Sequence, residues 1–154
     1  MAIIVVSRFS GEGWDRQSVE YGSLVPSEGK QAEQSRRIFE NGDYNLTLCE
    51  KKMIDTVCAS FKQVAVVLNV GGIVDTEWFA KEEKISSVVL AWQGGMEGGL
   101  AAADILLGAE SPSGKLPDTF AVSLEDYPST ADFHESQDYV DYTEDIYVAY
   151  RYFE

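Results

Sequence analysis

Residues 64–70, with the sequence VAVVLNV, decide the fold of this 154-residue chain. Six of the seven residues are apolar, and the run has the length of one strand. A run without polar alternation is typical of a strand that is buried on both faces, as in a parallel sheet. Residues 2–6 (AIIVV) and 86–92 (SSVVLAW) have the same character. We therefore expect three buried, parallel strands.

The segments between these runs predict helices. Residues 31–40 have the composition of a short helix, and a second helix should begin at Asn45 or Thr47, with Glu50 in its first turn. Its apolar residues recur on one face at helical spacing. They are Ile54, Val57, Cys58 and Phe61.

Three further segments complete the expected elements. Residues 73–84 could form a helical turn, and residues 146–153 a last strand or extended segment. Residues 96–107 (MEGGLAAADILL) predict a helix that ends at Gly108, and its glycines and alanines would let it pack closely on the sheet.

Strands that alternate with helices indicate an α/β fold. We expect a doubly wound, mainly parallel sheet with helices on both faces, a sandwich of the flavodoxin-like kind. Residues 1–154 should form one domain. A start directly on an apolar strand suggests that the domain is truncated.

Composition excludes several classes of partner. The chain has 12 basic and 26 acidic residues, a formal net charge of −14, which argues against nucleic acid and anionic membrane surfaces. No apolar run has the roughly 18 residues of a membrane span, and no signal peptide is recognisable, so localisation stays unassigned.

His134 is the single histidine, and Cys49 and Cys58 would lie about 13 Å apart on one helix. We expect no metal site, no disulfide and no cofactor.

The acidity is concentrated at the C-terminus. Residues 125–154 contain nine acids, one base and eight aromatic residues. Because disordered acidic tails are poor in aromatic residues, this composition predicts an ordered segment that packs its rings and leaves its carboxylates outside.

Three loops should share one edge of a parallel sheet, at the carboxyl ends of the strands: residues 7–16, 69–75 and 92–99. In the first, Glu12 lies between Gly11 and Gly13. A dinucleotide-binding loop would need a glycine where Arg16 stands, and Glu12 would repel a pyrophosphate. No Ser-His-Asp triad is legible. Glu12 can be a general acid or base, although a solvated turn carboxylate is the simpler interpretation of this residue alone.

Four blocks of sequence resemble glycoside hydrolase family 3, the β-glucosidase family. Residues 10–16 (SGEGWDR) resemble its acid/base loop, and residues 66–78 (VVLNVGGIVDTEW) the next strand and loop of its C-terminal domain. Residues 91–120 and 142–153 are similar to its two later segments. The resemblance covers nearly the whole chain in the family's order.

The resemblance implies a function. Members of the family combine a barrel-like domain, which carries the nucleophilic Asp, with an α/β sandwich, and this chain would be most of the sandwich. Glu12 matches the general acid/base of a retaining glycosidase. Ser10, Trp14 and Arg16 would contribute to substrate binding. The expected partners are a β-linked glucoside or oligosaccharide and the barrel domain, and the fragment alone should be inactive.

Two departures and one alternative accompany this interpretation. Ala149 stands where the family usually has Gly, and Ala121 where it often has Pro. The alternative function is a non-catalytic carbohydrate-binding or domain-interaction module. A nucleotide-binding flavodoxin-like domain is a third reading, which a bound-cofactor spectrum would have to support.

Overall fold

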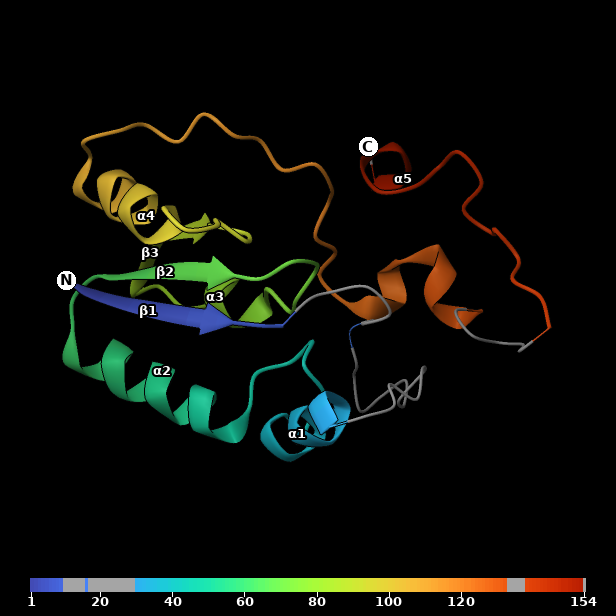
Figure 1. Ribbon diagram of the computed structural model, residues 1–154, viewed down its shortest axis with the longest axis horizontal. Coiled ribbons are helices and arrows are strands. Elements are labelled where there is room, and N and C mark those ends of the chain that lie inside the picture. The colour runs from blue at the N-terminus through green and yellow to red at the C-terminus, as the bar shows by residue number, and fades with distance from the viewer. Residues whose placement is uncertain (10–15, 17–29, 133–137, 154) are drawn as a thin grey trace.

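The computed structural model describes residues 1–9, 16, 30–132 and 138–153 (Figure 1). The elements follow one another as strands, helices and short 3-10 turns. In chain order they are β1 (Ala2–Ser7), α1 (Lys30–Ile38), α2 (Leu48–Ser60), β2 (Val64–Asn69), α3 (Glu77–Ala80), β3 (Ile85–Leu90), α4 (Gly98–Leu107), η1 (Leu124–Asp126), η2 (Pro128–Ala131) and α5 (Tyr150–Phe153).

The three expected strands form one parallel sheet in the order β1-β2-β3. The register places Ala2 beside Val64 and Ser7 beside Asn69. On the other side of β2 the pairing shifts between Val64 and Ala65. All three strands run in the same direction, so their carboxyl ends meet at one edge (Figure 1).

The central strand β2 forms the core because both of its faces are covered. Val64, Val66 and Leu68 are fully buried and pack with the side chains that α2 and β1 direct inward. Burial of such side chains stabilises a fold by about 1.5–3 kcal/mol each. The partners from α2 are Ile54 and Cys58, and those from β1 are Ile4 and Val6.

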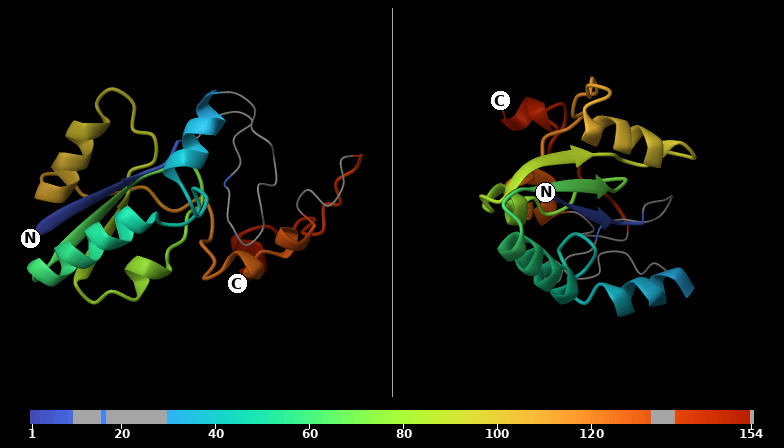
Figure 2. Two further views of the ribbon diagram at one scale, coloured as in Figure 1. Left: turned by 90° about the horizontal axis from the view of Figure 1, so that it is seen from below. Right: turned by 90° about the vertical axis from the view of Figure 1, so that its left-hand side faces the viewer.

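Helices lie on both faces of the sheet, as expected for a doubly wound fold: α1 and α2 on one side and α4 on the other (Figure 2). The expected close packing of α4 is wrong, because no residue of α4 is buried. A Cβ atom added at Gly98 or Gly99 would meet no atom within 4 Å. The tight approach is at Gly94 instead, where an added Cβ would lie 2.8 Å from the Gly98 Cα.

The ends of α2 and α4 are defined by local chemistry. Thr47, one of the two predicted caps, accepts a hydrogen bond from the Glu50 backbone N–H, and the Glu50 carboxylate accepts one from the Thr47 N–H. This reciprocal capping box begins α2. Cys49 and Cys58 are both on α2 and both free, as expected. Gly108 ends α4 in the left-handed conformation, with φ 74°.

The C-terminal segment differs from the expected strand, because residues 150–153 form the short helix α5. Its aromatic rings pack only in part. Phe153 lies edge-on against Tyr127 and Tyr152, with ring centroids 5.8 and 5.1 Å apart, whereas Tyr142 is 88% exposed. Within the described residues, no helix is long and apolar enough to span a membrane.

The two departures from the family sequence have different structural consequences. Ala149 has φ 54°, a left-handed conformation that glycine adopts without strain. The backbone N–H of Ala121 donates a hydrogen bond to the Tyr127 hydroxyl at 2.9 Å. Proline at position 121 would remove this donor.

We predict that Ala149→Gly raises the free energy of unfolding by up to about 1 kcal/mol, since it relieves the strain of a left-handed alanine. Urea denaturation followed by circular dichroism measures the change. Ala101→Gly is the matched control in an exposed part of α4, and it should cost about 1 kcal/mol. A loss of stability in both variants would contradict the argument.

Candidate functional site

The carboxyl edge of the sheet is held together beyond the last strand residues. The backbone N–H of Arg8 donates to the Asn69 carbonyl at 3.1 Å, so the pairing of β1 and β2 extends one residue past β1. The Asn69 side-chain amide lies 3.5 Å from the Ser7 hydroxyl. The chain segments that follow β1 and β2 therefore leave the sheet from adjacent, fixed points.

Arg8 is a buried charge at this edge, with a side chain only 1% exposed. Its Nη1 and Nη2 donate to the two carboxylate oxygens of Glu50 at 2.7 and 2.8 Å. Its Nε donates to the Asp43 carbonyl, and its Nη2 also to the Asn45 carbonyl, both at 2.8 Å. The guanidinium lies 4.6 Å from the centre of the Phe39 ring. One side chain thus joins β1 to residues 43–45 and to the start of α2.

The Glu50 carboxyl is the anionic half of this pair. Its burial by itself would raise its pKa, but hydrogen bonds from Arg8 and Thr47 outweigh that effect and hold the pKa below its ordinary value. Glu50 therefore stays ionised opposite Arg8 while it caps α2. Both roles depend on the same charge.

Arg16 is the member of the predicted site that the structure describes. Its Nη1 donates to the Phe9 carbonyl at 2.7 Å and to the Asp43 carboxylate at 2.8 Å. Its Nη2 is buried and has no hydrogen-bond partner among the described residues. A Cβ atom added at Gly72 would lie 3.8 Å from the Arg16 Nε, so Arg16 also lies beside the loop that follows β2.

Ser10, Glu12 and Trp14 lie outside the described residues. The structure instead describes the two residues that flank them, Phe9 and Arg16, and the hydrogen bond between these two.

Sequence reasoning missed Arg8 and Asp43. A charged residue directly after an apolar strand was the available signal for Arg8, because such a position is buried and requires partners. For Asp43 the signal was its place after Gly42 in the turn that leads to α2.

The loop after β2 is anchored by the same segment. The Asp75 N–H donates to the Tyr44 carbonyl, and the Trp78 indole N–H donates to the Asp75 carbonyl, both at 3.0 Å. Tyr44 is buried, and this burial, together with the charge of Asp75, raises the pKa of its phenol well above its ordinary value. Beyond the end of β3, Trp92 lies near Phe120, with ring centroids 6.4 Å apart.

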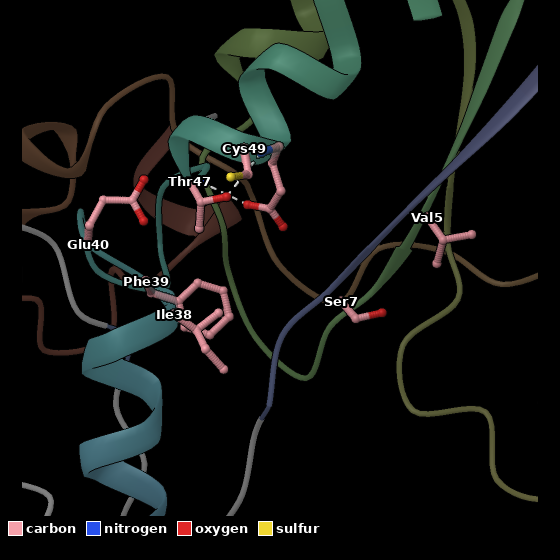
Figure 3. A pocket seen from close by; sticks show the side chains of 8 residues that line it. Val5, Ser7, Ile38, Phe39, Glu40, Thr47 and Cys49 are labelled. Carbon is pink, nitrogen blue, oxygen red and sulfur yellow. Dashed lines mark hydrogen bonds between the residues drawn. The ribbon is translucent and has the colours of Figure 1, made fainter.

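A pocket of about 450 Å³ lies next to Arg8, between β1, the end of α1 and the start of α2 (Figure 3). The loops after β2 and β3 contribute no residue to it, so it is distinct from the shared edge of the three expected loops. No cluster of metal-ligating side chains occurs in the part of the chain that the structure describes. The pocket is lined by Val5, Ser7, Ile38, Phe39, Glu40, Thr47, Cys49 and Glu50.

These features define an α/β domain that presents its loops at the carboxyl edge of a parallel sheet, the usual place for a ligand site in this class. The chain belongs to the family described as the glycosyl hydrolase family 3 C-terminal domain, which matches residues 1–150. The family resemblance of the sequence blocks is thereby confirmed.

Similar proteins carry the name beta-glucosidase. The chain is 63% identical over 154 residues to beta-glucosidase A of Butyrivibrio fibrisolvens, covering 99% of this chain and 19% of that protein. It is 47% identical over 113 residues to a beta-glucosidase of Ruminococcus albus, covering 73% and 12%. The crystal structure of a beta-glucosidase from Paenibacillus barengoltzii matches with a TM-score of 0.75 and 42% identity, covering 98% of this chain and 14% of that one. The chain thus spans at most about a fifth of these relatives.

We predict that Glu50→Gln lowers the free energy of unfolding by about 3 kcal/mol at pH 7, because it leaves the buried Arg8 without its counter-charge. The folded-state pKa of Glu50 lies below the unfolded value, so its contribution is present above about pH 4.3 and is lost as the pH falls through the folded-state pKa. The stability difference from the unsubstituted chain should therefore narrow in acid.

Denaturation from pH 7 to pH 3 measures this difference. Glu77→Gln is the control, since Glu77 forms an exposed ion pair with Lys81 and should change stability by less than about 1 kcal/mol. A difference for Glu50→Gln that is small at pH 7, or that is the same at every pH, would show that the Arg8–Glu50 pair does not act as described.

Proposed function

We propose that this chain belongs to the C-terminal domain of a retaining glycoside hydrolase of the β-glucosidase type, and that Glu12 is its general acid/base. The observation that carries the proposal is the family match over residues 1–150, together with the similarity to beta-glucosidases over nearly the whole chain. The described structure supports it through Arg8 and Arg16, which stand on either side of residues 10–15 in the sequence and both donate hydrogen bonds to Asp43.

The proposed chemistry needs two carboxyl groups about 5–5.5 Å apart. A nucleophilic carboxylate, contributed by a barrel domain outside these 154 residues, attacks the anomeric carbon. Glu12 donates a proton to the leaving oxygen, and the glycosyl-enzyme forms. Glu12 then removes a proton from water, which attacks the anomeric carbon and releases the sugar with its original configuration.

The substrate class under this proposal is a β-linked glucoside or oligosaccharide. Ser10, Trp14 and Arg16 would shape the sugar subsite, with Trp14 as a stacking surface and Arg16 as a hydrogen-bond donor. Nη2 of Arg16, which is buried and has no hydrogen-bond partner among the described residues, is a donor available for this role while Nη1 binds Phe9 and Asp43. The barrel domain would complete the site, so it is the partner that catalysis requires.

A non-catalytic module is the second candidate function. The observation that favours it is the aromatic surface of the C-terminal segment, where the rings of Tyr139, Tyr142, Tyr147 and Tyr150 are exposed. Aromatic faces are common in surfaces that bind partners. Calorimetric titration of the chain with glucose or cellobiose separates the two functions. Binding by the chain alone favours the non-catalytic module, and the absence of binding favours a chain that contributes only one of the two catalytic carboxyl groups.

We predict that Glu12→Ala in the full-length enzyme lowers kcat/KM for cellobiose by at least about 100-fold, since a poor leaving group needs protonation. For dinitrophenyl β-glucoside the loss should be about tenfold or less, because this leaving group departs without a proton. Azide should restore turnover of the aryl glucoside and yield the β-glucosyl azide. Equal losses on both substrates, with no azide product, would remove Glu12 from this role.

We also predict that the 154-residue chain by itself releases no nitrophenol from nitrophenyl β-glucoside, because it contains only one of the two carboxyl groups. Spectrophotometric assay at high protein concentration measures this. Glu12→Gln is the control for contaminating activity. Turnover by the chain that disappears in Glu12→Gln would show that the site is complete within these residues.

A further inference from the structure

We propose that Asp43 is a positioning residue for the acid/base segment, residues 10–15, and that it acts through Arg16. This inference rests on the proposed function of Glu12. Asp43 does not touch substrate in this scheme. It fixes Arg16, the first described residue after the segment, although the two residues lie 27 positions apart in the sequence.

Asp43 contacts both arginines that flank the segment. Its backbone carbonyl accepts a hydrogen bond from the Arg8 Nε, and its carboxylate accepts one from the Arg16 Nη1, each at 2.8 Å. Arg8 precedes residues 10–15 and Arg16 follows them. Asp43 therefore binds a residue on each side of the segment.

The Asp43–Arg16 pair is shielded from solvent. The side chains of Asp43 and Arg16 are 3% and 11% exposed. Charge-assisted hydrogen bonds in such surroundings are shorter and stronger than those between neutral groups. Removing the Asp43 carboxylate would leave the Arg16 guanidinium buried without its counter-charge, so Arg16 would have to move toward water.

The residues around Asp43 make it a rigid anchor. Gly42 turns the chain with φ 77°, and its N–H donates to the Phe39 carbonyl at 3.1 Å. On the other side, the Tyr44 carbonyl accepts from Asp75, and Thr47 caps α2. Because backbone hydrogen bonds hold Asp43 on both sides, its carboxylate can transmit a fixed position to Arg16.

Arg16 in turn holds Phe9, the residue that precedes the segment. The same Nη1 atom that binds Asp43 donates to the Phe9 carbonyl at 2.7 Å. Without Asp43, Arg16 would keep the exposed hydrogen bond to Phe9 as its remaining hydrogen bond among the described residues. A displacement of about 1 Å in a catalytic group can cost on the order of 100-fold in rate.

The test compares Asp43→Ala and Asp43→Asn in the full-length enzyme, on cellobiose and on dinitrophenyl β-glucoside. Asp43→Ala should lower kcat/KM for cellobiose by about 10- to 100-fold. The loss for the aryl glucoside should be clearly smaller, because this substrate loses only the sugar contact of Arg16 and does not need the proton. Asp43→Asn removes the charge but keeps an oxygen acceptor for Arg16, so it should lose less activity on cellobiose than Asp43→Ala while still affecting cellobiose more than the aryl glucoside. It provides the same comparison of substrates if the alanine variant fails to fold.

Val64→Ala is the matched control, because Val64 is fully buried at the far end of β2 from this edge. It should lower thermal stability without changing the ratio of the two substrates' kcat/KM values. Equal losses on both substrates for the Asp43 variants, or a ratio no different from that of Val64→Ala, would reduce Asp43 to a stabilising residue and overturn the inference.

Glu12→Ala, assayed in parallel, separates the two proposals. If Glu12→Ala discriminates between the substrates and Asp43→Ala does not, the positioning role alone is wrong. If Glu12→Ala does not discriminate, the acid/base assignment fails, and the positioning role that depends on it fails with it.

Discussion

The burial of the Arg8 guanidinium is the constraint on which the site edge depends. A buried charge is tolerated only when it is paired and hydrogen-bonded. Arg8 meets this requirement with Glu50 and with the carbonyls of Asp43 and Asn45. Since these partners come from the turn before α2 and from its first turn, satisfying one side chain fixes residues 43–50 against the end of β1.

The same turn then serves two loops. Asp43 holds Arg16 through its carboxylate, and the Tyr44 carbonyl accepts a hydrogen bond from Asp75 in the loop after β2. Loops that carry function are commonly held by a rigid scaffold. In this chain the scaffold includes residues 43–47 as well as the sheet, and this addition holds Arg16, and through it Phe9, on either side of residues 10–15. The proposed acid/base chemistry relies on that arrangement.

Local patterns explain which features could be predicted from sequence. The apolar run of β2 requires burial on both faces, and Thr47 with Glu50 forms a capping box within four residues. The contacts of Arg8 and Asp43 span 35 residues and follow no periodic pattern, so sequence could not pair them. The close packing expected of α4 failed for a related reason: small residues permit an approach, but neighbouring elements decide whether it occurs. The tight contact lies instead where the loop after β3 meets the start of α4, between Gly94 and the Gly98 Cα.

The central claim is that Glu12 delivers the proton to the leaving group, and the pH dependence of kcat/KM in the full-length enzyme tests it most directly. With cellobiose as substrate, activity should fall at high pH as the general acid loses its proton. The account predicts that this basic limb is present in the unsubstituted enzyme and absent from the residual activity of Glu12→Gln. A basic limb that persists unchanged in Glu12→Gln would contradict it.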